Sequence, residues 1–324
     1  MNQSQPEISV IIPAYNAEKT IGKCLKSLKN QNVKKGYEII VVDDGSIDRT
    51  KQVVKKFRNI LLLEQKHKGP AAARNLGAKN ANGKILLFTD ADCFAKKDWI
   101  KEMIKPFENK EIIGVQGAYG TKQKSIFARF AQFEIEERYD RMRKNDYIDF
   151  IGSYSAGYKK DIFLKSGGFD ESFPMASGED PALSFKLSEL GYKMVFNPKA
   201  VVYHKHPDTL KKYLRQKFWR AYWRVLLYKK YPKKIKSESY TPQTLKIQIF
   251  LTYLFSISSI LVFFGLNAII PLLIFFVILI STLPLSYKNF RKDKMVGLFS
   301  PFIILMRSIS FSLGLLYGFV RMIL

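Results

Sequence analysis

Short apolar runs and amphipathic segments alternate along the first hundred residues. The runs cover Ile8–Ile12, Glu38–Val42, Ile60–Leu63 and Ile85–Phe88 and consist mostly of Ile, Val and Leu. Segments with helical spacing and polar faces lie between them, at Ala17–Asn30, Asp48–Phe57 and Pro70–Ala81. Continuous apolar strands separated by helices are typical of a parallel sheet that is covered on both faces. The pattern therefore predicts an α/β domain with a mostly parallel sheet.

Further helical patterns follow this region. The sequence predicts helices at Trp99–Phe107, where Asp98 is a candidate cap, and at Ser125–Lys144. The glycine-rich segment Gly152–Gly191 predicts loops and a single helix, Asp180–Leu190, which Gly191 would end.

The chain from Leu245 onward contains three long apolar stretches. Ile247–Leu266 and Ala268–Leu285 are each long enough to cross a bilayer, whereas Leu298–Val320 is interrupted by Arg307. We therefore expect about three transmembrane helices at the carboxyl end, and Arg307 leaves open whether the third stretch crosses completely.

Charge divides the chain at the same place. The 324 residues include 53 Lys and Arg against 28 Asp and Glu, a formal net charge of +25 that favours an anionic partner. Lys205–Lys236 contains twelve Lys and Arg and a single acid, with apolar residues at helical spacing. This pattern is typical of a basic amphipathic helix that lies on anionic membrane lipid. We therefore divide the chain into a soluble domain at residues 1–204, an interfacial segment at 205–244 and a membrane domain at 245–324.

The Lys and Arg residues also predict the orientation in the cell membrane. The link between the first two apolar stretches is uncharged around Asn267, whereas Ser286–Gly297 contains four cations. Because positively charged links stay in the cytosol, the second link is expected there. Met1–Glu7 is polar and has no apolar core of a signal peptide. We therefore expect a multi-pass membrane protein whose amino-terminal domain is cytosolic.

Composition excludes several classes of protein. With 47% hydrophobic residues the chain is not disordered, and two cysteines cannot form a disulfide framework. Nucleic-acid binding would also use the positive charge, but the neighbouring apolar stretches make membrane lipid the simpler anion, so we expect no nucleic acid as a partner. Three spans with few polar residues offer little material for a transport pathway, which argues against a transporter.

Two acidic motifs follow predicted strands. Asp43-Asp44-Gly45-Ser46 ends the second strand, and Asp90-Ala91-Asp92 ends the fourth. Ligands of open α/β sheets bind outside the carboxyl ends of the strands, where Asp43 and Asp44 could accept hydrogen bonds from a base or ribose. Carboxylates spaced like Asp90 and Asp92 could bind Mg²⁺ or Mn²⁺. Each motif alone fits a plain turn, but their common sheet edge favours a ligand site.

Two other motifs have competing interpretations. Gly178-Glu179-Asp180-Pro181 opens a helix, so its carboxylates either stabilise the helix terminus or supply a general base. In the segment Lys68–Asn75, Arg74 could reach a phosphate, although helix packing explains the small residues equally well. The three histidines have no ligand-like partners in the sequence, so we expect them not to bind a metal; they are His67, His204 and His206.

Together these motifs resemble glycosyltransferase family 2. The resemblance extends from about Ile8 to Arg220 and is specific, because several motifs must coincide in order and spacing. They are Ile8–Asn16, Asp43–Ser46, Gly69–Asn75, Asp90–Asp92, Gly167–Glu171 and Gly178–Asp180. The resemblance implies a Rossmann-like nucleotide-binding domain of the GT-A fold, a nucleotide-sugar donor, a divalent cation (Mg²⁺ or Mn²⁺) and inversion at the anomeric carbon.

The resemblance also implies roles for individual residues. Pro13, Ala14 and Tyr15 would border the nucleotide, as would Asp43 near the base. Arg74 and Asp90 would line the nucleotide as well, and Asp92 would bind the metal. Asp180 corresponds to the catalytic base, with Glu179 beside it.

The expected activity is transfer of one sugar from a nucleotide-sugar donor to an acceptor hydroxyl, on a lipid-linked saccharide or other glycan at the cytosolic membrane face. Processive synthases of this family have Gln-x-x-Arg-Trp, whereas Gln216–Arg220 here ends in Trp-Arg, which argues against processive synthesis. The alternatives are such a processive polysaccharide synthase and a transferase that loads a sugar onto a polyprenyl phosphate. The Glu179-Asp180 pair argues against the latter, because an ionised phosphate needs no base.

Overall fold

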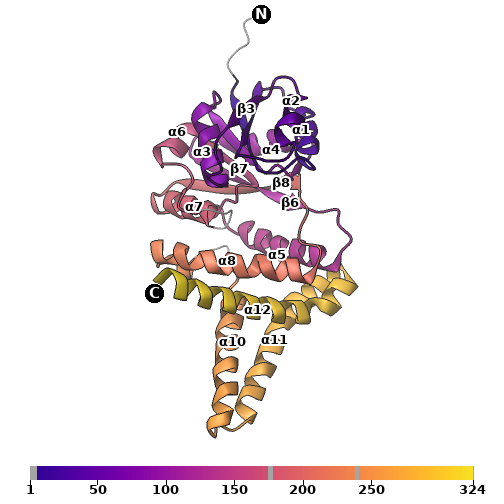
Figure 1. Ribbon diagram of the computed structural model, residues 1–324, viewed down its shortest axis with the longest axis vertical. Helices are drawn as coiled ribbons and strands as arrows, with labels where there is room; N and C mark the ends of the chain where they lie inside the picture. The colour runs from indigo at the N-terminus through magenta and orange to yellow at the C-terminus, as the bar shows by residue number, and fades with distance from the viewer. Residues whose placement is uncertain (1–5, 174–177, 238–240, 324) are drawn as a thin grey trace, which may run out of the picture. The chain divides into compact units, whose positions relative to one another are not determined.

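The computed structural model describes residues 6–173, 178–237 and 241–323 (Figure 1). It consists of two compact units. The first comprises Met1–Lys122 and Tyr139–Lys205, and the second comprises Gln123–Arg138 and His206–Leu324. Residues 1–5 of the polar amino-terminal stretch and residues 174–177 of the glycine-rich segment lie outside the described residues.

The first unit is built on one mixed, mostly parallel sheet. Its strands lie in the order β3-β2-β1-β4-β7-β6-β8-β5. The bounds are β1 Ile8–Ala14, β2 Tyr37–Asp43, β3 Leu61–Glu64, β4 Ile85–Thr89, β5 Phe94–Ala95, β6 Ile112–Gly120, β7 Ser155–Lys159 and β8 Lys193–Tyr203. β1 to β4 pair in parallel, as do β6 and β8, whereas β7 runs antiparallel to both of its neighbours and β5 runs antiparallel to β8. The α/β fold and the first four predicted strands are thus confirmed.

Helices cover both faces of this sheet. They are α1 Ile21–Lys29, α2 Thr50–Lys55, α3 Pro70–Asn80, α4 Trp99–Ile104, α6 Lys160–Lys165 and α7 Glu179–Glu189. Alternate residues of β1 share a core with α1 and α4, whereas α3 lies on the opposite face, where Gly77 allows close contact with Ile11 and Val42. β1 is therefore buried almost throughout, which explains its unbroken apolar sequence.

Two local expectations were wrong. The segment Gly152–Gly191 contains β7 and α6 in addition to the predicted helix. β7 has few large apolar residues, and its Gly157 packs closely against Leu87 and Met103. Asp98 precedes α4 but does not cap it, since its carboxylate accepts a hydrogen bond from the Asn32 amide instead.

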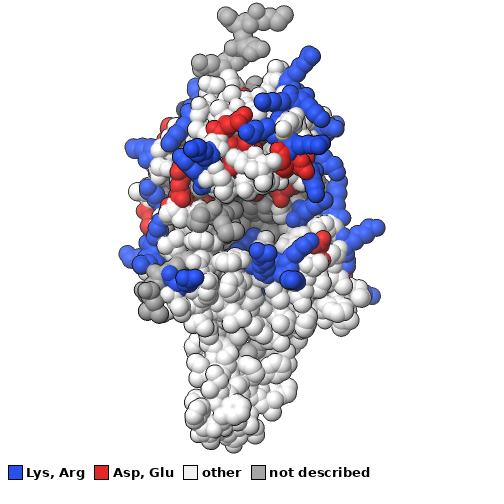
Figure 2. Space-filling model, viewed as in Figure 1, with Lys and Arg blue, Asp and Glu red and all other residues white. Residues whose placement is uncertain are grey.

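The second unit is helical. It contains α8 Leu210–Lys230, α9 Lys234–Ser237, α10 Gln243–Leu261, α11 Ile269–Lys292 and α12 Lys294–Ile323, while α5 Ile126–Met142 begins in this unit and ends in the first. Three helical segments are long and apolar enough to cross a membrane: Gln243–Phe264, Ile269–Lys292 and Lys294–Arg321. The antiparallel hairpin of α10 and α11 carries no Lys, Arg, Asp or Glu between Lys246 and Lys288 and is correspondingly white in Figure 2. These helices indicate anchoring in a membrane.

Candidate active site

The predicted nucleotide residues gather at the carboxyl ends of three adjacent strands. Pro13 and Ala14 end β1, Asp43 ends β2, and Asp90 follows β4, with β1 in the middle. The backbone of Asp44 donates to the carbonyl oxygen of Ala14 over 2.8 Å, which fixes the turn after β2 against the end of β1. The sheet therefore brings together motifs that lie up to 77 residues apart in the sequence, from Pro13 to Asp90.

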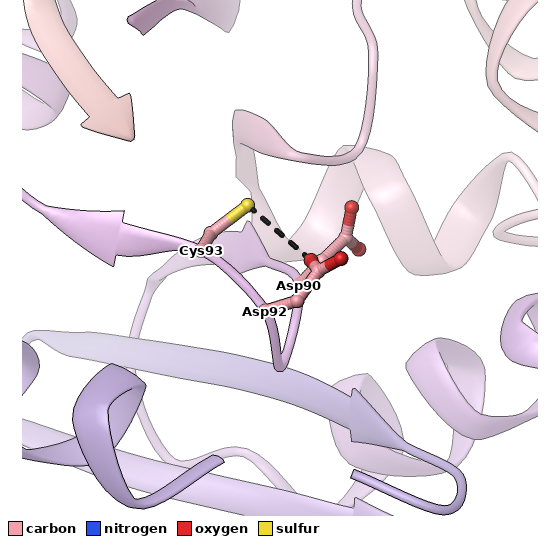
Figure 3. A group of neighbouring side chains, drawn as sticks. All are labelled: Asp90, Asp92 and Cys93. Atoms are coloured by element: carbon pink, nitrogen blue, oxygen red, sulfur yellow. Dashed lines mark hydrogen bonds between the residues drawn. The ribbon is translucent and has the colours of Figure 1, made fainter. Parts of the chain in front are cut away.

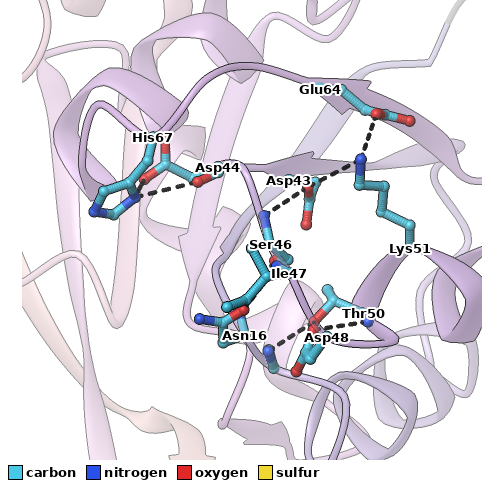
Figure 4. Close-up of polar contacts among 11 residues, drawn as sticks. Asn16, Asp43, Asp44, Ser46, Ile47, Asp48, Thr50, Lys51, Glu64 and His67 are labelled. Atoms are coloured by element: carbon cyan, nitrogen blue, oxygen red, sulfur yellow. Dashed lines mark hydrogen bonds and ion pairs between the residues drawn. The ribbon is translucent and has the colours of Figure 1, made fainter.

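The two carboxylates of the Asp43-Asp44 pair have different surroundings (Figure 4). Asp43 is fully buried, and its Oδ2 accepts from the Ser46 backbone over 3.1 Å. Its Oδ1 is buried with no hydrogen-bond partner among the described residues. A buried acceptor without a donor is costly, so this atom is a candidate to bind a ligand donor.

Asp44 instead organises the loop before α3. Its Oδ1 accepts from the Gln65 amide over 2.6 Å and from the Lys68 backbone over 2.9 Å, and its Oδ2 accepts from the Gly69 backbone over 2.9 Å. The His67 Nδ1 lies 2.9 Å from Oδ2 (Figure 4). Both oxygens therefore already have donors within the protein, which distinguishes Asp44 from Asp43.

An aromatic pair lies beside this loop. The Tyr15 and His67 rings stack with centroids 4.1 Å apart and an interplanar angle of 24°. Tyr15 is 47% exposed although it follows a buried strand. An exposed flat ring at the edge of a nucleotide site is suited to contact a base or ribose.

Arg74 is the centre of the site. Its guanidinium is buried, with Nη2 donating to Asp90 Oδ1 over 2.8 Å and Nη1 to Glu179 Oε1 over 3.0 Å. Burial by itself would lower the Arg74 pKa, but Asp90, Asp180 and Glu179 outweigh it and hold that pKa above its ordinary value. Arg74 thus joins the end of β4 to the start of α7 as a permanent cation.

Asp180 lies in the first turn of α7, next to Glu179. Burial raises the pKa of Asp180 to about 7, and the charge of Glu179 acts in the same direction, while Arg74 opposes both. The helix begins at Glu179 without a side-chain capping bond, and Asp180 Oδ1 is buried with no donor among the described residues. A carboxylate with this pKa and an uncommitted oxygen is poised to exchange a proton near neutral pH.

Asp90 and Asp92 form a small acidic cluster at the end of β4 (Figure 3). One ligand atom from each of Asp90, Asp92 and Cys93 lies within 4.8 Å of the others. Burial raises the Cys93 thiol pKa well above its ordinary value, so the sulfur stays protonated. The carboxylate oxygens are consequently the candidate metal-ligand atoms of this cluster, and their chemistry suits a hard divalent cation.

His204 was missed by the sequence analysis. Its Nε2 lies 3.2 Å from Asp92 Oδ2, so the expectation that this histidine has no ligand-like partner is wrong. Burial would raise the pKa of Asp92, but the hydrogen bond and charge of His204 outweigh it and hold that pKa below its ordinary value. An imidazole that contacts a carboxylate in this way can fix the orientation of that carboxylate.

The other predicted motif, Gly167–Glu171, contacts α3. The Asn75 amide donates to the Phe169 carbonyl and to Glu171 Oε1, both over 2.8 Å, while the Phe169 backbone donates to Asn75 Oδ1 over 2.9 Å. The Phe169 ring lies 5.6 Å from the Arg74 guanidinium carbon. The Gly167–Glu171 motif thus contacts both Asn75 and Arg74 of α3.

Comparison with known proteins identifies this arrangement. Residues 9–166 match the family model described as "Glycosyl transferase family 2". Residues 9–166 of the chain therefore belong to glycosyltransferase family 2. The glycosyltransferase AglE of Haloferax volcanii is 29% identical over 206 residues, which are 60% of this chain and 66% of AglE. A dolichyl N-acetyl-alpha-D-glucosaminyl phosphate 3-beta-D-2,3-diacetamido-2,3-dideoxy-beta-D-glucuronosyltransferase of Methanococcus voltae is 27% identical, with 64% and 70% of the two chains covered.

A solved structure confirms the fold of this family 2 chain. The mannosyltransferase PcManGT of Pyrobaculum calidifontis, solved with GDP-Man and Mn²⁺, aligns with a TM-score of 0.62 and 19% identity. The alignment covers 97% of this chain and 88% of PcManGT, so the GT-A fold is shared. Family membership and fold thus rest on different comparisons.

The contact between the Gly167–Glu171 motif and Asn75 can be tested in this glycosyltransferase by substitutions at two adjacent glycines. Gly167 and Gly168 both have positive φ, but an added Cβ meets nothing within 4 Å at Gly167 and lies 2.4 Å from Asn75 Oδ1 at Gly168. Gly167→Ala should cost only the left-handed backbone strain, about 1–2 kcal/mol. Gly168→Ala should cost about 1–3 kcal/mol more, because the contact with Asn75 must open.

Thermal unfolding of both variants measures the difference, with Gly167→Ala as the matched control. Equal melting temperatures for the two variants would show that the Asn75 contact contributes nothing.

Proposed function

We propose that this chain catalyses inverting transfer of one sugar from a nucleotide-sugar donor to an acceptor hydroxyl, with a lipid-linked saccharide as the acceptor. The observation that supports this most directly is Asp180, a carboxylate with a pKa of about 7 beside the Arg74 network. A hydroxyl is a weak nucleophile near neutral pH, and a base with this pKa can take its proton as the new bond forms. Family 2 membership supports the donor class.

The ends of the strands would bind the donor. Asp43 Oδ1 would accept a hydrogen bond from the nucleotide base, and the exposed ring of Tyr15 would border it together with Pro13 and Ala14. Arg74 would fix Asp90 and Glu179, since one of its terminal nitrogens donates to each of them. Asp44 would act through the loop that it organises.

Asp92, with Asp90, would hold a divalent cation. The donor set fits Mn²⁺ or Mg²⁺, since the two carboxylates lie close together while the Cys93 thiol stays neutral, and His204 would orient Asp92 through its contact with Oδ2. A bound cation would neutralise the negative charge that develops on the departing diphosphate. The PcManGT structure, which was solved with Mn²⁺, supports this proposal at the level of the fold.

The reaction then needs a single displacement. The acceptor oxygen forms the bond to the anomeric carbon, the bond to the diphosphate oxygen breaks, and Asp180 takes the hydroxyl proton. One displacement inverts the anomeric configuration. Glu179 would assist indirectly, because its charge helps to raise the Asp180 pKa.

Two observations support a lipid-linked saccharide as acceptor. The chain has apolar helices for membrane anchoring, and the name of the Methanococcus voltae relative describes transfer to a dolichyl phosphate-linked sugar. The cations from Lys288 in α11 to Lys294 at the start of α12 favour the cytosolic side for the catalytic unit by the positive-inside rule. The order Trp219-Arg220 favours transfer of one sugar over processive synthesis.

Removal of divalent cations should abolish turnover. EDTA should stop release of the nucleoside diphosphate, and added Mn²⁺ or Mg²⁺ should restore it. His204→Ala should raise the Mn²⁺ concentration needed for half-maximal activity by about tenfold or more, because Asp92 loses the contact that orients its carboxylate. His67→Ala is the control and should leave that concentration unchanged. Full activity in EDTA would contradict the metal role.

Asp180→Asn should lower kcat by about 10²–10⁴ because an amide cannot accept the proton. Nucleotide affinity should stay unchanged. Asp161→Asn is the matched control, since Asp161 also lies in the first turn of a helix, α6, but is exposed. Near-normal kcat in Asp180→Asn would instead favour transfer to a polyprenyl phosphate, which needs no base.

The pH dependence follows from the same group. The raised Asp180 pKa means that the base is protonated below about pH 7, so kcat should rise with pH through a midpoint near 7. The free energy of unfolding should instead fall as pH rises through 7. Burial costs less for the neutral carboxyl than for the carboxylate, and Asp180 loses its proton in that pH range. At pH 8 Asp180→Asn should therefore melt no lower than wild type. A kcat that is flat from pH 5.5 to 8.5 would contradict the assignment.

A further inference from the structure

The last apolar helix, α12, runs parallel to the basic helix α8. Three close contacts join residues that all differ by 96 in number: Ser310 with Leu214, Gly314 with Phe218, and Gly318 with Tyr222. The Ser310 hydroxyl donates to the Leu214 carbonyl over 2.8 Å, and a Cβ added to Gly314 would lie 2.3 Å from the Phe218 carbonyl oxygen. A constant offset means that the two helices stay side by side over at least eight residues, about 12 Å of helix.

α8 cannot lie in the hydrocarbon of a membrane. Its 21 residues include eight Lys and Arg. Exposed cations occur at both ends, at Lys211, Lys212 and Arg215 and again at Lys229 and Lys230. Charged side chains in a bilayer centre are costly, whereas a basic amphipathic helix is stable on an anionic surface. Because α12 runs beside α8, it shares the depth of α8.

A buried ion pair in the middle of α12 also argues against a position within the bilayer. The Arg307 guanidinium donates to Glu134 Oε1 over 2.7 Å and to Gln248 Oε1 over 2.8 Å. Glu134 Oε2 also accepts from the Lys217 ammonium of α8 over 2.7 Å. If α12 crossed a bilayer, Arg307 would be near its centre, and Glu134 and Lys217 would be drawn there with it.

α12 also contacts the α10–α11 hairpin at its open end. Gln248, in the first half of α10, bonds to Arg307, and Tyr253, near the middle of α10, bonds to the Ser312 carbonyl. Asn289, in the last turn of α11, donates to the Ser300 hydroxyl over 2.9 Å. Figure 1 accordingly shows α12 running across the hairpin rather than along it.

The outer face of α12 is apolar. The exposed residues are Met295, Leu298, Phe299, Phe302, Leu313, Leu316, Tyr317, Phe319 and Val320. The inner face contains Arg307 and several buried serines, so the polar side chains point into the protein. Lipid is the partner that fits an apolar face joined to an apolar hairpin and flanked by the cations of α8.

We propose that α12 is an in-plane membrane helix, embedded by its outer face in the single leaflet that α8 contacts. Only α10 and α11 cross the bilayer. The chain thus crosses twice, and its carboxyl terminus lies on the same side of the membrane as its catalytic unit. The expectation of a third span at residues 298–320 is replaced by this arrangement.

Cysteine labelling tests the topology in the full-length protein. The two native cysteines are buried, and the unmodified protein measures their background. A cysteine appended after Leu324 and one at exposed Lys35 should react with an impermeant maleimide from the same side of sealed vesicles. A cysteine at Asn267, in the hairpin link, should react only from the opposite side. An appended cysteine that reacts together with Asn267 would overturn the proposal.

Spin-label depth provides a second test that does not depend on the carboxyl terminus. Leu298, Leu313 and Val320 are exposed and lie within about 60° of one another around the α12 axis. Labels there, attached in purified protein in anionic vesicles, should report similar and shallow depths. Labels at Ile247, Leu254 and Leu261 of α10 are the control and should show the deepest position in the middle. The same profile along α12, with Leu313 deepest, would show that α12 spans.

Discussion

The catalytic unit depends on a guanidinium buried among carboxylates. Arg74 is 2% exposed, and such a cation is tolerated in a protein interior only when ion pairs and hydrogen bonds replace its water. Its two terminal nitrogens bond to Asp90 at the end of β4 and to Glu179 at the start of α7, so the sheet edge and α7 are fixed together. Asp180 Oδ1 is buried and has no donor among the described residues, and burial raises the Asp180 pKa. The same ion cluster therefore holds the fold together and sets the protonation of the proposed base.

The helical unit uses the reverse arrangement, a buried anion held by two cations. Glu134 accepts from Lys217 of α8 and from Arg307 of α12. Burial would raise the Glu134 pKa, but the two cations outweigh it and hold that pKa far below its ordinary value, so the carboxylate stays charged. A buried pair of this kind adds little net stability, yet breaking it is costly, which makes it suited to fixing one register between helices. The 96-residue offset between α8 and α12 is the register that results.

The sequence predicted β1, β2 and β4 because those strands are mostly buried and so are continuously apolar, and it predicted β3 from its three leucines although that strand is partly exposed. It did not predict β7, where Gly157 packs closely against Leu87 and Met103, and it could not place His204. His204 lies 112 residues after Asp92, and its position follows from the antiparallel pairing of β5 with β8, where Phe94 faces Tyr203. His204 directly follows Tyr203, so the same antiparallel pairing brings His204 next to the residues that precede Phe94. Such a register is set by tertiary contacts and leaves no local signal in the sequence.

Hydropathy and packing disagree about α12 for a related reason. Its mean hydropathy of 1.7 is high enough for a membrane span, as are the values of 2.0 and 2.5 for the two hairpin helices. An average of this kind does not record which face of the helix each residue occupies. A buried charge separates the cases: Arg307 lies near the middle of α12 and is buried, whereas the hairpin has no Lys, Arg, Asp or Glu between Lys246 and Lys288. Small polar residues occur on the buried side of all three helices, but a charge near the centre of a spanning helix is costly, and Arg307 is instead paired with Glu134. Arg307, rather than average hydropathy, is therefore the feature of the sequence that reflects the packing of α12.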